Sequence, residues 1–186
     1  MSDSAPDPHK LCLACGLCCR GGWFATGELG QDELEDAKSA GLHVNDAPGQ
    51  VALRLPCPKF LGGCCSIYDS WRPKVCGAYS CALLNKYMAG DVAEKEALNL
   101  VTAAVVMFDR IVAETGPMEG GIAGQEFLQL LSASEQGQVA GGRQLSPVAK
   151  MDVVALKVFF ARHFRKPGDM VEPSATRDVS LPGDGD

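Results

Sequence analysis

Nine cysteines constrain this chain more than any other feature, because all of them lie within the first 81 of its 186 residues. Four occur in one eight-residue segment, Cys12-x-x-Cys15-x-x-Cys18-Cys19. A disulfide framework rarely crowds four thiols so closely, whereas one loop wraps a metal centre with little loss of chain entropy. Thiolates are soft ligands suited to zinc, Cu(I) and iron–sulfur clusters. The other five follow at Cys57, Cys64, Cys65, Cys76 and Cys81.

The chain is long and apolar enough to form one domain around its own core. Hydrophobic residues make up 46% of it, and a domain of this size buries roughly 70% of the surface of its unfolded chain. We predict a single metal-binding domain over residues 10–166, divided into a cysteine-rich segment, 12–81, and a helical segment, 82–166. The prolines, glycines and acidic residues of 167–186 predict a disordered tail.

Charge and hydropathy limit the partners and the compartment. The net charge is −6 and neither half of the chain is basic, which argues against non-specific nucleic-acid binding. The first ten residues lack the pattern of a secretory signal, and the apolar run Val101–Phe108 is too short to span a bilayer. We therefore expect a cytoplasmic protein without a membrane partner, whose odd number of cysteines stays reduced.

Short elements are expected in the cysteine-rich half. Residues 1–9 are polar and predict disorder, and the first cysteine motif predicts a loop. The acidic start and following glycine predict a helix over Gln31–Ala40. Alternating residues predict a strand over Val51–Leu55. A second short strand is expected over Cys65–Tyr68, and a turn or irregular helix over Arg72–Cys81.

Three helices are expected in the second half. The first has Asp91 as its cap and ends at Gly116-Pro117; the second covers roughly Gln125–Gln136; the third begins at Ser146-Pro147. The first helix carries an apolar stripe at helical spacing, made of Leu98, Val101, Val105, Phe108 and Val112. The predicted fold class is α-rich with minor β, an irregular metal-organised half packed on about three C-terminal helices.

Two interpretations of the cysteines remain open. In the iron–sulfur interpretation, Cys12, Cys15 and Cys18 hold three corners of a [4Fe–4S] cubane, and a remote cysteine such as Cys57 completes the site, much as in ferredoxins. In the zinc interpretation, the thiols form one or two tetrahedral sites, with enough for two four-cysteine sites and one left over. The isolated Cys64 is better explained as a small buried hydrophobic residue.

Later motifs add a family resemblance. Cys65-Ser66-Ile67-Tyr68 is followed by Arg72-Pro73-Lys74-Val75-Cys76 and then by Tyr79-x-Cys81. With the first motif upstream, this order resembles the CxxCxxCC cysteine-cluster family, a zinc- or iron-chelating domain, over residues 12–81. Three residues separate Tyr68 from Arg72, where the family pattern has two. The resemblance implies that the metal ligands are Cys12, Cys15, Cys18, Cys19, Cys57, Cys65 and Cys76, with Cys81 extending the last motif and Cys64 unassigned.

The family also includes flagellin lysine N-methylases, in which this module resembles an iron–sulfur site. This association favours iron–sulfur chemistry here and does not make this chain a methylase. We therefore expect a [4Fe–4S] protein with a redox or substrate-positioning role, acting with a protein redox partner or a protein substrate. A non-enzymatic zinc module for structure or interaction is the alternative, and metal delivery or sensing is a third. No hydrolase, Walker or dinucleotide-binding pattern indicates an enzyme class.

Residues near the cysteines have two interpretations each. Arg72 either donates hydrogen bonds towards thiolate or cluster sulfur or forms a salt bridge with Asp69. Tyr68, Trp71 and Tyr79 either shield the centre from water or belong to the core, and core is the more common role for such aromatics.

Overall fold

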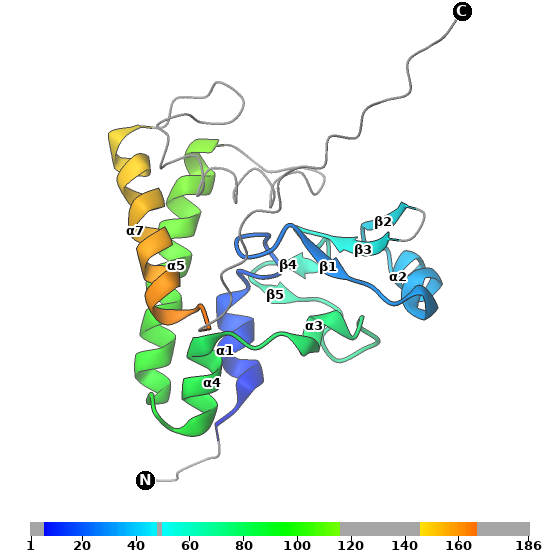
Figure 1. The fold of residues 1–186 in the computed structure, drawn as a ribbon, viewed down its shortest axis with the longest axis horizontal. Helices are drawn as coiled ribbons and strands as arrows, with labels where there is room; N and C mark the ends of the chain where they lie inside the picture. The colour runs from blue at the N-terminus through cyan, green and yellow to red at the C-terminus, as the bar shows by residue number, and fades with distance from the viewer. Residues whose placement is uncertain (1–5, 48–49, 116–145, 167–186) are drawn as a thin grey trace, which may run out of the picture.

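The computed structural model describes residues 6–47, 50–115 and 146–166, which fold into a helical part and a sheet part (Figure 1). The helical part contains α1 (Pro8–Cys15), α4 (Ala82–Ala89), α5 (Glu94–Thr115) and α7 (Pro147–His163). Short strands, two further α-helices and a short 3₁₀ helix form the other part. The predominance of helices over small sheets confirms the predicted α-rich class with minor β.

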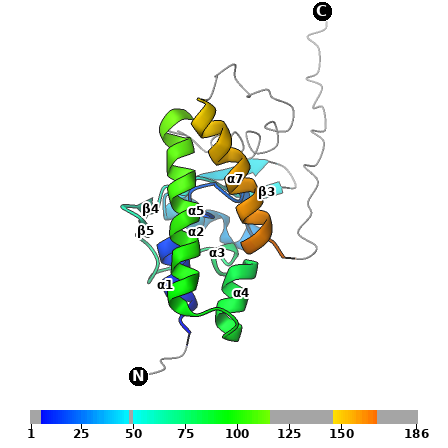
Figure 2. The same cartoon turned by 90° about the vertical axis from the view of Figure 1, so that its left-hand side faces the viewer.

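Helices α5 and α7 pack side by side along one end of the molecule (Figures 1 and 2). The predicted start of α7 is confirmed, because the Ser146 side chain accepts a hydrogen bond of 3.1 Å from the backbone N–H of Ala149. The predicted cap of α5 is wrong, since the helix begins at Glu94 rather than after Asp91. The sequence did not single out α4. The predicted helix over 125–136 and the predicted helix end at 116–117 lie outside the described residues.

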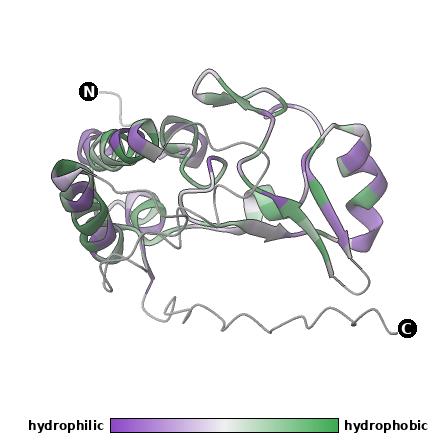
Figure 3. Cartoon of the chain, turned by 90° about the horizontal axis from the view of Figure 1, so that it is seen from above, coloured by the Kyte–Doolittle hydropathy of each residue, from purple (hydrophilic) through white to green (hydrophobic). Residues whose placement is uncertain are grey.

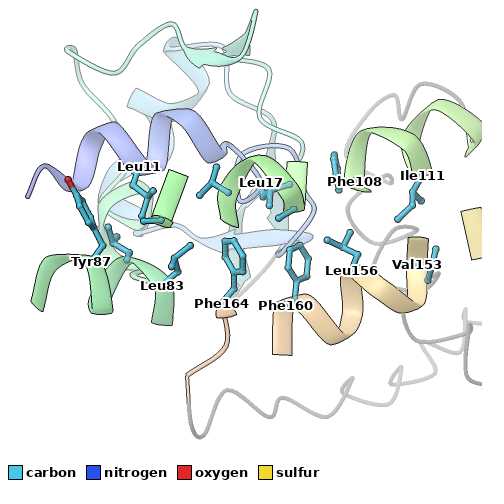
Figure 4. Close-up of a cluster of buried hydrophobic side chains, with 14 of the residues drawn as sticks. Leu11, Leu17, Leu83, Tyr87, Phe108, Ile111, Val153, Leu156, Phe160 and Phe164 are labelled. Atoms are coloured by element: carbon cyan, nitrogen blue, oxygen red, sulfur yellow. The ribbon is translucent and has the colours of Figure 1, made fainter. Parts of the chain in front are cut away.

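The helical part has its own hydrophobic cluster, to which α1, α4, α5 and α7 each contribute (Figure 4). On α5 the fully buried positions recur at spacings of three and four, as an amphipathic helix requires. They include Val101 and Phe108 of the predicted stripe, while Leu98, Val105 and Val112 pack against the cluster partly buried. Figure 4 shows Leu11 and Leu83 near one end of the cluster, and Val153 and Ile111 near the other.

The sheet part is a three-stranded antiparallel sheet with strand order β1-β3-β2. Its strands are β1 (Thr26–Glu28), β2 (Val44–Ala47) and β3 (Gln50–Arg54). The predicted strand over 51–55 is therefore confirmed, and so is the predicted helix over 31–40, which forms as η1 (Gln31–Glu33) and α2 (Leu34–Ser39). A second hydrophobic cluster lies here, made of Leu29, Leu34, Ala37, Leu42, Leu53 and Leu55.

A small hairpin and one helical turn complete the cysteine-rich half. The hairpin pairs β4 (Phe60–Leu61) with β5 (Cys64–Cys65). The strand expected over 65–68 is wrong beyond Cys65, where the chain turns. The irregular helix expected over 72–81 is confirmed as α3 (Val75–Ala78). Seen from above, α2 lies at the opposite end of the molecule from α5 and α7 (Figure 3).

The first cysteine motif is helical rather than a loop. Asp7 caps α1 by accepting a hydrogen bond of 2.9 Å from the His9 N–H, and Pro8 occupies the first helical position, where its missing N–H costs nothing. The prediction of disorder over 1–9 is therefore wrong for residues 7–9. Residues 1–5 and the tail predicted over 167–186 lie outside the described residues. None of the described helices combines the length and apolarity needed to cross a membrane.

Candidate metal centre

A cavity of about 390 Å³ is lined by side chains of both hydrophobic clusters. Eight of the nine cysteines line it, together with Arg72, Tyr68 and Tyr79. These eight are Cys12, Cys15, Cys18, Cys19, Cys57, Cys65, Cys76 and Cys81. They come from α1, from the turn after α1, from the segment before β4, from β5, from α3 and from the start of α4. Folding thus brings together thiols that are up to 69 positions apart in the sequence (81 − 12 = 69).

Helix α1 and the turn after it present the first four thiols. Cys12 and Cys15 are three residues apart on the helix and so lie on one face. Gly16 ends the helix in the left-handed conformation, with φ +58°, and its N–H donates to the Cys12 carbonyl at 2.9 Å. Turn hydrogen bonds from Arg20 to Gly16 and from Gly22 to Leu17, each 2.9 Å, then fix Cys18 and Cys19.

The hairpin closes against the end of α1 because residue 16 has no side chain. A Cβ atom built on Gly16 would lie 2.1 Å from Cζ of Phe60, well inside contact distance. The ring of Phe60 therefore occupies the space that a side chain at 16 would need. This close approach brings β4, and with it the neighbouring Cys65 on β5, against the first motif.

Strand geometry separates Cys64 from Cys65. Successive side chains of a strand point to opposite faces, so of these two neighbours only Cys65 lines the cavity. Cys64 is exposed, and its thiol donates to the Leu61 carbonyl at 3.4 Å. The prediction that Cys64 is a buried hydrophobic residue is wrong, and the reason is this alternation.

Cys76 is positioned through a buried glutamate. Glu33 is only 7% exposed, and its carboxylate accepts hydrogen bonds from the backbone N–H groups of Lys74 at 2.8 Å and Gly30 at 3.2 Å. The Lys74 side chain also pairs with Asp32 at 2.9 Å. These contacts attach the start of α3 to η1. Sequence reasoning missed Glu33, whose one signal is an acidic residue at the third position of a short helical turn.

Cys81 occupies the N-cap of α4. Its sulfur accepts a hydrogen bond of 3.4 Å from the backbone N–H of Leu84. Burial raises the pKa of Cys81, and N–H groups of Leu84 and Leu83 and the charge of Lys166 act in the opposite direction. The ammonium group of Lys166 also lies 5.2 Å from the centre of the Tyr79 ring.

The protein around the thiols disfavours their unliganded charged form. Burial raises the pKa of Cys15 and of Cys19 to about 12 and that of Cys76 to about 11, and neighbouring thiolates add to each shift. Burial also raises the pKa of Cys12, Cys57 and, strongly, Cys18, although Cys12 and Cys18, like Cys76, retain exposed surface. Without a cation the neutral form of these thiols is favoured, and a metal that binds must displace their protons.

Arg72 lies beside the site rather than in a salt bridge. Its guanidinium lies over the Tyr68 ring, 4.0 Å from the centre, and its charge works against the burial and the thiolate repulsion that raise the pKa of Cys76. Among the described residues it makes no ion pair with Asp69. Tyr68 and Tyr79 line the cavity, whereas Trp71 is 39% exposed and does not.

The donor set fits a thiophilic metal or an iron–sulfur cluster better than a hard cation. Eight of the groups on the cavity wall are sulfurs, and the walls are otherwise mostly apolar. His9, His43 and His163 do not line this cavity. Within residues 6–47, 50–115 and 146–166, no three cysteine, histidine or acidic side chains are already arranged to hold one ion. Ligation would therefore require rotation of thiol side chains towards each other.

No family model matches this chain, and neither a curated protein nor a solved structure matches it significantly. The likeness to the CxxCxxCC family therefore stays a prediction from its motifs.

Proposed function

We propose that this protein binds an iron–sulfur centre, of the [4Fe–4S] type, through the thiolates of its cavity. The observation that carries the proposal is that eight thiols, up to 69 positions apart in the sequence, line one cavity. The cavity volume of about 390 Å³ is many times the roughly 30 Å³ that a water molecule occupies in the liquid, which leaves room for an inorganic core larger than one ion. Such a centre supplies electron transfer or a Lewis-acidic iron for positioning a substrate.

The surroundings suit a cluster that must be shielded and neutralised. Apolar side chains of both hydrophobic clusters line the walls, and Arg72 and Lys166 place positive charge beside Cys76 and Cys81. Solvent exposure and hydrogen bonds to sulfur are among the factors that set the potential of such a centre. A protein redox partner or a protein substrate would then use the centre.

A structural zinc site is the second candidate, and one observation favours it. The cavity lies against two separate hydrophobic clusters, so metal held there would cross-link the helical part to the sheet part. Structural zinc sites contribute directly to folding energy. The same thiols could also deliver or sense a metal.

Metal and acid-labile sulfide analysis of protein purified without oxygen tests the proposal. We expect iron and sulfide in equal amounts, lost or strongly reduced in Cys15→Ser and retained in the exposed matched control, Cys64→Ser. Zinc without sulfide would replace the first candidate by the second. Protein that retains no metal and takes up neither iron with sulfide nor zinc would contradict both.

A further inference from the structure

The eight cavity thiols are not equivalent neighbours of each other. Besides burial, the pKa of Cys12 is raised by Cys81, and Cys81 also acts on Cys15 and Cys18. The thiols that act most on Cys19 are a different set, namely Cys57, Cys76 and Cys65. Backbone geometry divides the cysteines in the same way.

The first group is Cys12, Cys15, Cys18 and Cys81, which we call the helical group. It is built where the end of α1 meets the start of α4. The backbone N–H of Asp7, the cap of α1, donates to the Tyr87 hydroxyl of α4 at 3.1 Å, which ties these helices together. Cys15 and Cys81 both pack against the cluster of the helical part.

The second group is Cys19, Cys57, Cys65 and Cys76, which we call the hairpin group. The backbone N–H of Cys57 donates to the Cys19 carbonyl at 2.7 Å. The Ser66 N–H donates to the Lys59 carbonyl at 2.8 Å, so the residues that follow Cys57 and Cys65 lie side by side. Cys57 packs against the cluster of the sheet part, as do Ile67 and Val75, the neighbour of Cys76.

The boundary between the two groups falls at one peptide bond. Cys18 and Cys19 are consecutive and act on each other. Apart from Cys19, the thiols that raise the pKa of Cys18 are those of the helical group, whereas those that most raise the pKa of Cys19 are the other three of the hairpin group. Each group also has its own cation, because Lys166 acts on Cys81 and Arg72 acts on Cys76. Four thiolates form a complete ligand set for one tetrahedral Zn²⁺ or one [4Fe–4S] cluster.

We propose that the cavity holds two metal centres rather than one, the first bound by Cys12, Cys15, Cys18 and Cys81 and the second by Cys19, Cys57, Cys65 and Cys76. The inference rests on the proposed function, since both centres require that the cavity binds metal. Each divalent ion that binds four thiols displaces four protons and leaves a complex with charge −2. The Cys18–Cys19 peptide bond joins the two centres directly.

A titration of the reduced, metal-free, full-length protein with Co²⁺ alone tests this number. Cobalt bound by thiolates gives a sulfur-to-metal charge-transfer absorption, which reports each filled site. Wild-type protein is expected to saturate at two ions per chain. Cys81→Ser and Cys76→Ser are each expected to lose one, and circular dichroism checks that each variant remains folded. Cys12→Ser and Cys57→Ser replace them if either fails to fold.

Matched pairs of substitutions make the result decisive. The double variant Cys12→Ser with Cys81→Ser removes two ligands from the helical group and should leave one ion bound. Cys76→Ser with Cys81→Ser removes one ligand from each group and should leave none. Saturation at one ion in wild type, or equal loss in both pairs, would overturn the two-centre inference and leave the proposed function intact. No thiolate absorption in wild type would instead contradict the proposed function itself.

Discussion

The backbone N–H of Cys57 donates a hydrogen bond of 2.7 Å to the carbonyl of Cys19. This bond places Cys57, the one candidate ligand that belongs to no short motif, against the end of the first motif. Cys57 is thereby held among the thiols of the cavity by backbone structure, before any metal binds. The folded chain therefore brings its candidate ligands together before metal binding, although their final geometry awaits ligation.

Gly16→Ala should destabilise the protein by more than its backbone conformation alone explains. A non-glycine residue at φ +58° costs about 1–3 kcal/mol, and the added Cβ would also collide with Phe60. Denaturant unfolding of the metal-free protein measures the loss. Gly90→Ala is the matched control, because Gly90 has φ +79° and no atom within 4 Å of a built Cβ. Equal losses in both variants would contradict the role of the Phe60 contact.

The sequence predicted the parts of the fold that depend on local patterns. The α5 stripe, the strand at 51–55 and the cap at Ser146 each follow from neighbouring residues, and each is present. The helix at Pro8–Cys15 was missed because the cysteine spacing was interpreted as a metal-wrapping loop, although Asp7-Pro8 is a good helix start. In this segment the local helix-start residues determine the structure, and the cysteine spacing does not prevent a helix.

The candidate site was predictable in membership but not in arrangement. The family resemblance implied the same eight cysteines that line the cavity, while the exposure of Cys64 depends on strand alternation in a two-residue strand that no sequence pattern marked. The division of the eight cysteines into a helical group and a hairpin group depends on long-range backbone hydrogen bonds, such as the one between Cys57 and Cys19. Contacts of this kind leave no periodic signal in the sequence.

Glu33→Ala should release α3 from the sheet part. The variant leaves the N–H groups of Lys74 and Gly30 without their carboxylate partner, which should cost about 1–3 kcal/mol of the free energy of unfolding. Denaturant unfolding of the metal-free variant tests this. Glu35→Ala, which removes only an exposed pairing with Lys38, should change stability little. A similar small effect at both positions would rule out the anchoring role of Glu33.

Arg72→Gln should weaken metal binding without removing a ligand. The guanidinium favours the Cys76 thiolate, and loss of such outer partners typically lowers metal affinity about 10- to 100-fold. Competition with a chelator measures the affinity. Arg162→Gln, on the exposed side of α7, serves as the charge-matched control. Unchanged affinity in Arg72→Gln would show that this arginine only packs on Tyr68.

Metal-free, reduced protein should lose stability at alkaline pH. The pKa of Cys15 and Cys19 in the folded chain is raised to about 12, from an ordinary value of 9.0. The unfolded chain therefore releases protons that the folded chain retains, so this stability is present below pH 9 and is lost as pH rises towards about 12. Thermal unfolding across this range should give a steadily falling Tm.

Thiol substitutions separate this effect from other alkaline effects. The Tm of Cys15→Ala should fall less steeply above pH 9 than that of wild type, because one raised pKa is removed. Cys64→Ala, at an exposed thiol outside the cavity, should keep the wild-type slope. Parallel slopes for all three proteins would contradict the assigned cause.

Thiol alkylation followed by mass spectrometry tests the central claim most directly, because it counts the cysteines that the metal protects. Metal-loaded protein is expected to be alkylated at Cys64 alone, and all nine cysteines should react after the metal is removed under denaturing conditions. Rapid alkylation of any cavity cysteine in the loaded protein, at the rate of Cys64, would contradict its assignment as a ligand.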